Sequence, residues 1–66
     1  MKRAKIDINR ASRKALETLP LIGPKRSARI IMFRRINGWF RTIDDLDSVP
    51  GIGKKIISRI REYITV

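Results

Sequence analysis

Hydrophobic residues recur at helical spacing in the middle of the chain. Ile30 and Ile31 fall on one face of a 3.6-residue period, which predicts a helix over about residues 24–36 with both isoleucines facing inward. Gly38 follows this stretch, and a glycine suits the left-handed cap with which helices commonly end. The pattern therefore predicts one long central helix with a sharp stop.

Both ends of the chain are patterned as well. Near the C-terminus, isoleucines recur every three or four positions, at Ile57, Ile60 and Ile64. This spacing predicts a helix over about residues 54–63 with these side chains inward. Near the N-terminus, residues 5–9 alternate between polar and apolar. They are expected to form an extended strap whose Ile8 packs on the core.

Proline and glycine mark the turns between helices. Pro20 and Pro50 each end a short preceding helix, because a proline disfavours helical backbone in the residue before it. Gly23 and Gly53 close the turns that follow. Pro24 suits the first position of the next helix, where its missing N–H would have had no intrahelical partner.

The short helices before these turns begin with capping residues. Ser12 is the expected N-cap of the first helix. Thr42 is the expected N-cap of the second, and Asp45 three residues later can reach back to its backbone. We therefore assign Asp44 and Asp45 to capping rather than to catalysis.

The whole arrangement occurs twice, at an offset of 30 residues. The aligned pairs are Ser12 with Thr42, Leu16 with Leu46, Leu19 with Val49, Pro20 with Pro50, Ile22 with Ile52, Gly23 with Gly53, Lys25 with Lys55, Arg29 with Arg59 and Ile30 with Ile60. Such a period indicates duplicated supersecondary units, here about residues 12–37 and 42–63. One unit alone would leave its apolar face uncovered, so we expect both to pack as one compact domain over residues 1–66.

The charge balance of the chain indicates what kind of molecule it binds. Sixteen lysines and arginines stand against six acids, so the formal net charge is +10 in 66 residues. Self-repulsion of this size destabilises a compact chain and indicates a polyanionic partner.

Composition also excludes several classes. Without cysteine or histidine, the usual zinc ligand sets and the catalytic arrangements built on these residues are ruled out. The basic start is not followed by the apolar stretch of a signal peptide. The longest apolar run is far shorter than the roughly 20 residues of a membrane span. A chain of this length leaves little room for an enclosed substrate cavity.

The two turns carry the candidate chemistry. The second reads Val49-Pro50-Gly51-Ile52-Gly53-Lys54-Lys55, in which glycine permits a positive φ and lets a phosphate approach closely. The first N–H groups of the next helix lack intrahelical partners and, with the helix dipole, attract anions. Ile52 is expected to point inward. A single copy is equally explained as a simple helix–helix turn, but two copies in so basic a chain favour phosphate binding without base reading.

Together these motifs resemble the tandem helix-hairpin-helix domains of the ComEA-like family, which are DNA receptors of natural competence. The resemblance runs from about Lys5 to Val66. It rests on Ile6-Asp7-Ile8-Asn9-x-Ala11-Ser12, Leu16-x-x-Leu19-Pro20-x-Ile22-Gly23-Pro24-Lys25, Ile30-Ile31-x-x-Arg34, Gly38-x-Phe40, Asp45-Leu46, Val49-Pro50-Gly51-Ile52-Gly53-Lys54-Lys55 and Tyr63-Ile64. It implies an all-α fold of four or five short helices whose hairpins contact phosphates across the minor groove of double-stranded DNA.

Two positions depart from the family pattern. The family has glycine where this chain has Leu21, and a leucine resists a positive φ and adds bulk to the turn. We therefore expect the first hairpin to be distorted, or to contact DNA less closely than the second. Pro24 also removes one backbone donor there. Ser27 stands where the family has alanine, and packing survives if its hydroxyl bonds back within the helix.

The predicted DNA contacts are the hairpin residues and the cations beside them. They are Ile22, Gly23, Lys25, Arg26, Arg29, Gly51, Ile52, Gly53, Lys54, Lys55 and Arg59. No catalytic, cofactor-binding or metal-binding residue is predicted. Phe33 and Phe40 are assigned to the core and Arg34 to a tie between helices. Trp39 is expected to pack beside Phe40 at the core edge, with stacking on a base or intercalation as the alternative.

Other roles stay open from the sequence. Lys25 and Lys55 occupy the place of the catalytic lysine in glycosylases that carry this motif, but those enzymes need a pocket for a flipped base, which this chain is too short to form. A structural protein-interaction domain would have little use for the basic face. A DNA-targeting module of a repair or recombination enzyme would look the same. We expect a monomer, cytoplasmic by default, or extracytoplasmic and membrane-tethered if the chain is an excised receptor domain.

Overall fold

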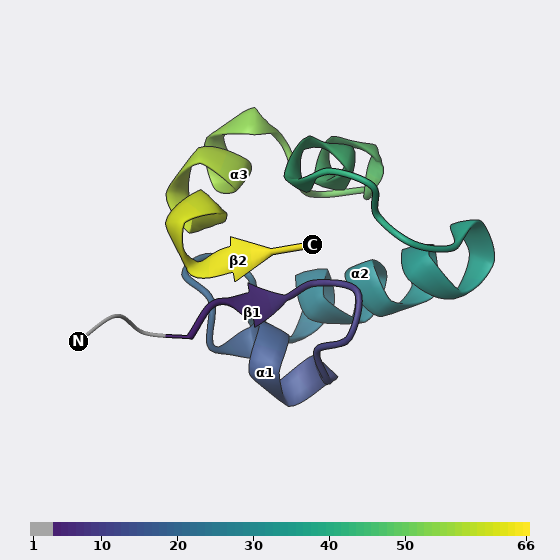
Figure 1. Ribbon diagram of the computed structural model, residues 1–66, viewed down its shortest axis with the longest axis horizontal. Helices are drawn as coiled ribbons and strands as arrows, with labels where there is room; N and C mark the ends of the chain where they lie inside the picture. Colours follow the sequence, from purple (N-terminus) through teal and green to yellow (C-terminus); the bar gives the residue numbers. More distant parts are fainter. Residues whose placement is uncertain (1–3) are drawn as a thin grey trace.

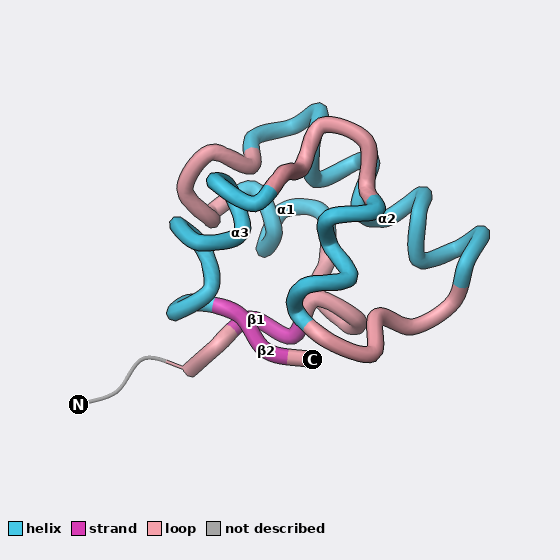
Figure 2. Tube along the Cα trace, turned by 90° about the horizontal axis from the view of Figure 1, so that it is seen from above, coloured by secondary structure: helices cyan, strands magenta, loops and turns pink. Residues whose placement is uncertain are grey.

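The computed structural model describes residues 4–66 and is mostly helical (Figures 1 and 2). In chain order the elements are β1 (Ile6–Asp7), α1 (Arg13–Glu17), α2 (Gly23–Asn37), the 3₁₀-helix η1 (Ile43–Ser48), α3 (Lys54–Ile60), the 3₁₀-helix η2 (Arg61–Tyr63) and β2 (Ile64–Thr65). The all-α class expected from the sequence is confirmed, with one very small sheet added. Within residues 4–66, no helix combines the length and apolar character needed to cross a bilayer.

The two repeat units occupy two halves of the molecule. In Figure 1, α1 and α2 lie in the lower half and η1 and α3 in the upper half. Strands β1 and β2 lie side by side between them and pair in parallel, with Ile6 opposite Ile64. The strap expected over residues 5–9 thus contains the two-residue strand Ile6–Asp7. Its partner was missed because Ile64 was read as the continuation of the last helix.

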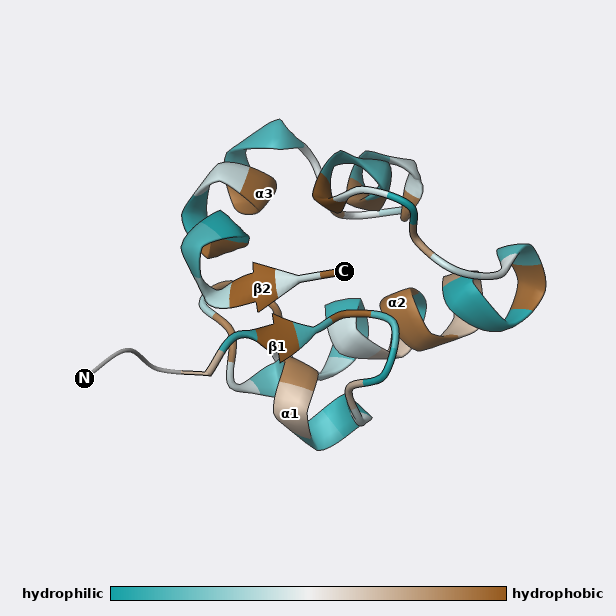
Figure 3. Cartoon of the chain, in the orientation of Figure 1, coloured by the Kyte–Doolittle hydropathy of each residue, from teal (hydrophilic) through white to brown (hydrophobic). Residues whose placement is uncertain are grey.

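The core is duplicated along with the sequence. Five pairs at the offset of 30 are buried together, namely Leu16 with Leu46, Leu19 with Val49, Ile22 with Ile52, Ser27 with Ile57, and Ile30 with Ile60. Ile8, Phe40 and Ile64 complete the buried cluster, and part of each strand is strongly hydrophobic in Figure 3. Each unit therefore covers the apolar face of the other, as the repeat predicted.

The first unit follows the sequence closely. The Ser12 hydroxyl caps α1 by accepting a hydrogen bond from the Ala15 amide at 3.2 Å. Ser27 is fully buried, and its hydroxyl donates to the Pro24 carbonyl at 2.9 Å, so the expected bond within the helix is present. Helix α2 stops at Gly38, whose φ of +87° is positive as predicted. Its ψ of −159°, however, lies outside the left-handed helical region.

The second unit is helical as predicted, but in a tighter form. Residues 43–48 form a 3₁₀-helix, and α3 ends at Ile60 before a 3₁₀ turn completes the predicted stretch. Short helical runs often take this form, and the aspartates and serine of η1 are weak α-helix formers. The Thr42–Asp45 capping box is present. Asp44 is not a cap; it forms an ion pair with Arg61.

Trp39 corrects one prediction. Its side chain is 68% exposed and lies under the guanidinium of Arg10, 5.7 Å from Cζ to the ring centroid. Phe40 is buried and stacks on Phe33, with ring centroids 5.4 Å apart. Gly38 ends the helix just before. In the non-helical chain that follows, neighbouring side chains face opposite sides, so the buried Phe40 turns Trp39 outward.

Two polar side chains join the strap to the rest of the fold. Arg34 Nη1 and Nη2 donate to the Ile8 and Ala11 carbonyls at 2.9 and 2.7 Å. Asn9 donates to the Phe40 carbonyl and accepts from the Phe40 amide. Arg34 is therefore a tie, as expected, but it holds the strap to α2 rather than one helix to another.

Candidate nucleic-acid interface

The first hairpin forms its tight turn in spite of its leucine. Leu21 adopts a φ of +66°, and Gly23 follows with +55°. The Ile22 amide donates to the Leu19 carbonyl at 3.3 Å, and the Ile22 side chain is buried. The leucine therefore does not prevent the turn, although the conformation is one that L-residues rarely adopt.

The second hairpin reaches the same turn without strain. Gly51 has a φ of +87°, and the Ile52 amide donates to the Val49 carbonyl at 3.0 Å. Gly53 is extended rather than left-handed, with φ −113° and ψ −175°. The two hairpins thus differ at the closing glycine, Gly23 against Gly53, and not at Leu21, where the expected distortion would lie.

The helix starts behind the two turns present different donors. The first intrahelical bond of α3 joins the Ile57 amide to the Gly53 carbonyl at 3.1 Å, and no side chain of the described residues caps this end. The amides before Ile57 therefore lie ahead of the hydrogen-bond ladder. Helix α2 begins with Gly23 in a left-handed conformation and has Pro24, which lacks an N–H, in its first turn. The first hairpin offers fewer backbone donors.

Arg26 joins the two hairpins. Its Nε donates to the Gly51 carbonyl at 2.8 Å, and its Nη1 donates to the Leu21 carbonyl at 3.1 Å. Arg29 Nη1 adds a longer contact to the Pro50 carbonyl at 3.4 Å. One guanidinium thus bonds the tips of both turns, so the two hairpins lie side by side and this side chain connects them.

Sequence reasoning treated Arg26 only as a phosphate contact and missed this bridge. The chain does carry a signal for it, because Arg26 aligns with Ile56 of the second unit. Ile56 packs against the core, whereas Arg26 is half-buried between the hairpins. A charged residue at a position that is apolar in the other repeat points to a contact that only one unit makes.

The other predicted contacts divide into two groups. Ile22 and Ile52 are buried and offer only their backbone to a ligand. The exposed cations are Lys25, Arg29, Lys54, Lys55 and Arg59. The structure thus brings the predicted residues together around two adjacent turns, and whether they contact DNA stays a prediction.

Acidic residues neutralise cations elsewhere on the molecule. The ion pairs among the described residues are Arg10–Asp7, Arg13–Glu17 and Arg61–Asp44. Asp45 accepts hydrogen bonds from the Thr42 and Arg41 amides, which lower the pKa of its carboxyl. Among the described residues, none of these pairs includes a cation of the hairpins.

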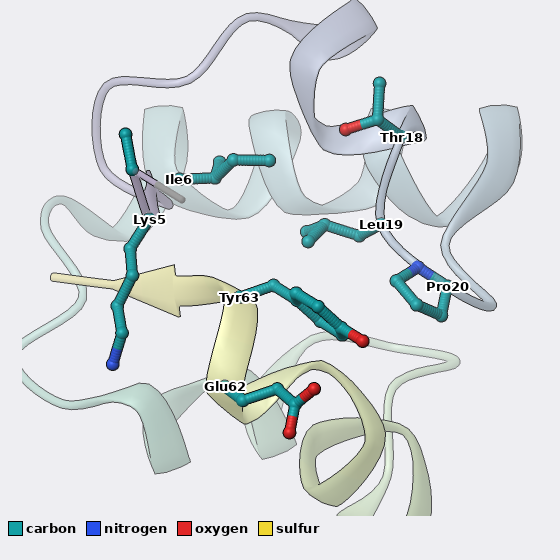
Figure 4. Close-up of a pocket in the computed structure, with 8 residues that line it drawn as sticks. Lys5, Ile6, Thr18, Leu19, Pro20, Glu62 and Tyr63 are labelled. Atoms are coloured by element: carbon teal, nitrogen blue, oxygen red, sulfur yellow. The ribbon is translucent and has the colours of Figure 1, made fainter. Parts of the chain in front are cut away.

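The surface also has a hollow of about 280 Å³ beside β1 and η2 (Figure 4). The Tyr63 ring, Leu19 and Pro20 line it, and the Glu62 carboxylate lies at its edge. Neither Lys25 nor Lys55 is part of its lining. A second hollow, of about 710 Å³ and more open to solvent, lies at the first hairpin and is lined by Lys25 together with Leu21 and Pro24.

Comparison with known proteins agrees with this geometry. A profile of the helix-hairpin-helix motif matches residues 1–65. The chain is 40% identical over 65 residues to ComE operon protein 1 of Bacillus subtilis (strain 168), a match that covers 98% of this chain and 32% of that protein. It is 39% identical over 51 residues to kinesin-like protein KIF22 of Xenopus tropicalis, covering 77% of this chain and 8% of the kinesin-like protein.

The chain thus spans about a third of one relative and less than a tenth of the other. The motif match nevertheless covers almost every residue, and both hairpins that define the motif are present in the structure. The chain belongs to the helix-hairpin-helix family and resembles the domain of ComE operon protein 1.

Proposed function

We propose that this chain binds double-stranded DNA without sequence preference, by contacting backbone phosphates on the minor-groove side. The observation that carries the proposal is the pair of hairpins that Arg26 holds side by side. Their exposed cations are left without acidic partners in a chain of net charge +10. A rigid pair of phosphate-binding turns matches a regular polyanion better than it matches a small ligand.

The chemistry of the turns supports binding without base reading. Backbone amides and lysine ammonium groups donate to phosphate oxygens, which are the same at every base pair. The buried Ile22 and Ile52 fix the turns to the core, so these donors are held in place before DNA arrives. Similarity to ComE operon protein 1 supports a role in DNA uptake.

A second role keeps the binding and changes its purpose. The match to the kinesin-like protein covers only 8% of that protein, so a domain of this kind also occurs as a small part of a much longer chain. This favours a DNA-targeting module as the second candidate. Both candidates make the same prediction for the isolated chain.

Fluorescence anisotropy with several unrelated duplexes of equal length tests the proposal. The affinities should agree within a few-fold, and log K against log salt should fall with a slope of about −4 to −5 if about four to six phosphates are neutralised. A hundredfold preference for one sequence would contradict phosphate reading. A flat salt dependence would instead favour a protein-interaction domain.

Charge-reversal variants test whether DNA binds at the second hairpin. Lys54→Glu with Lys55→Glu should weaken binding about a hundredfold, because each reversal replaces a charge-assisted bond with repulsion. Lys14→Glu with Arg35→Glu is the matched control, since it changes the net charge equally at exposed positions outside the two hairpins. Equal losses in the two variants would mean that total charge, and not the hairpin, determines affinity.

A further inference from the structure

Leu21 combines a strained backbone conformation with a side chain that lies largely on the surface. Among the described residues it is the one non-glycine residue with a positive φ, and this conformation brings the Cβ of an L-residue too close to the following carbonyl oxygen. Its side chain is 56% exposed. Strained residues of this kind cluster at sites that bind ligands.

The second hairpin shows what the fold alone requires at this position. Gly51, the counterpart of Leu21, makes the same turn with a φ of +87°. A Cβ at Gly51 would meet Arg29 Nη1, the end of a flexible side chain that would have to shift, so the second turn is covered by a guanidinium. The tip of the second hairpin is therefore polar, whereas the first ends in an exposed leucine.

The leucine is held in a fixed place relative to the second hairpin. Arg26 Nη1 donates to the Leu21 carbonyl, and Nε of the same guanidinium donates to the Gly51 carbonyl. The next residue, Ile22, is anchored in the core. Pro20 and Pro24 are exposed beside the leucine. The first tip is thus a rigid apolar projection with Lys25 next to it.

The first tip is a weaker phosphate ligand than the second, because the leucine side chain cannot donate to a phosphate and Pro24 lacks an N–H. The minor groove between two phosphate strands offers this tip a better ligand. Apolar side chains insert between base steps from this groove and partly unstack them. The cost of insertion is lowest where bases are already poorly stacked or mispaired.

We propose that Leu21 is an apolar wedge that enters the minor groove and makes this chain selective for duplexes containing a weakly stacked step. The inference rests on the proposed DNA binding and names the class of DNA that the same site prefers. It concerns DNA structure rather than sequence. Fully paired duplexes should still differ only a few-fold.

The test uses two fluorescent duplexes that are identical except for one central C·C mismatch. Both carry the same number of phosphates, so counterion release does not separate them. The wild-type chain should bind the mismatched duplex about tenfold more tightly, the factor that about 1.4 kcal/mol of additional apolar burial would give. Leu21→Gly should bind both duplexes equally.

Three substitutions of Leu21 separate a loss of the mismatch preference from a loss of folding. Glycine favours a positive φ, so Leu21→Gly should fold, and its thermal unfolding is measured alongside. Leu21→Met keeps a long apolar side chain and should keep the preference, whereas Leu21→Ala should lose most of it. A wild-type chain that binds both duplexes equally, or a preference that survives in Leu21→Gly, would overturn the wedge alone. No binding to either duplex would overturn the proposed function itself.

Discussion

The two hairpins have the same sequence pattern and the same buried anchors but different tips. Ile22 and Ile52 occupy equivalent buried positions. In the alignment of the two repeats, Leu21 corresponds to Gly51 and Pro24 corresponds to Lys54. The second turn keeps its amides and its flanking charge. The first has fewer donors and carries an apolar side chain instead.

The difference shows which parts of a duplicated unit the fold fixes and which it leaves free. Positions that are fully buried in both copies remain apolar, apart from the small Ser27, which aligns with Ile57. Arg26 departs from this symmetry, because one bridge is enough to join two turns. The surface of each turn is under no such constraint, so the two copies can meet the same ligand in different ways.

The largest expected effect tests the shared part of the comparison. Ile22→Ala and Ile52→Ala should each lower the free energy of unfolding by about 3 kcal/mol, because each removes a buried side chain and leaves a cavity. Urea titration followed by circular dichroism measures both. Ile36→Ala is the control, since this isoleucine is 73% exposed and its loss should change stability by less than about 0.5 kcal/mol.

Similar costs at the two anchors would confirm that the hairpins are equivalent in the core. A cost below about 1 kcal/mol at either anchor would contradict this equivalence. It would show that the corresponding turn is held mainly by other contacts.

A smaller effect, on duplex binding, distinguishes the tip of the second hairpin from that of the first. Lys55→Glu should weaken duplex binding about tenfold and Lys25→Glu about threefold, since the second turn keeps the backbone donors that place a phosphate beside its lysine. The two lysines are equivalent in the repeat, and both are exposed. Anisotropy at one salt concentration suffices, because the charge change is identical. A larger loss at Lys25 would reverse the assignment of the stronger hairpin.

The smallest effect concerns the helices that lead into the turns. Asp45 caps η1, whereas its counterpart in the first unit is Ala15, which has no carboxylate. Hydrogen bonds from the Thr42 and Arg41 amides hold the pKa of Asp45 below its ordinary value of 3.8. The stabilisation is therefore fully present above about pH 4, the ordinary range of an aspartate. It is lost as the pH falls through the lower pKa of the folded state.

Thermal unfolding between neutral and strongly acidic pH measures this contribution. Asp45→Asn should melt slightly below the wild-type chain at neutral pH, and the difference should shrink as the pH falls. A difference that does not change with pH would mean that the carboxylate charge contributes nothing to the cap.

Much of the fold could be predicted because the repeat constrained it. Two copies of one pattern located both turns, and Ser12 and Thr42 marked the helices before them. What the sequence could not supply were contacts between distant segments. The pairing of β1 with β2 joins opposite ends of the chain. The bridge from Arg26 depends on carbonyl positions that exist only after the two units have packed.

The candidate site was predicted in composition but not in arrangement. The cations near the turns follow from the motif, whereas Arg26 is occupied by two carbonyls and Trp39 lies on the surface. The positive φ of Leu21 could be anticipated only as a conflict between residue and turn. Local preference favoured another conformation, and the bridge and the buried Ile22 outweigh it.

The parallel pairing of β1 and β2 also sets how the fold would resist tension along the chain. The segment begins near β1 and ends just after β2, and the two strands run in the same direction. A pull on the two ends would slide one strand past the other instead of peeling them apart. The hydrogen bonds of the pair, including that from the Ile8 amide to the Thr65 carbonyl, would then be loaded together. This small sheet would therefore resist unfolding under tension by shear.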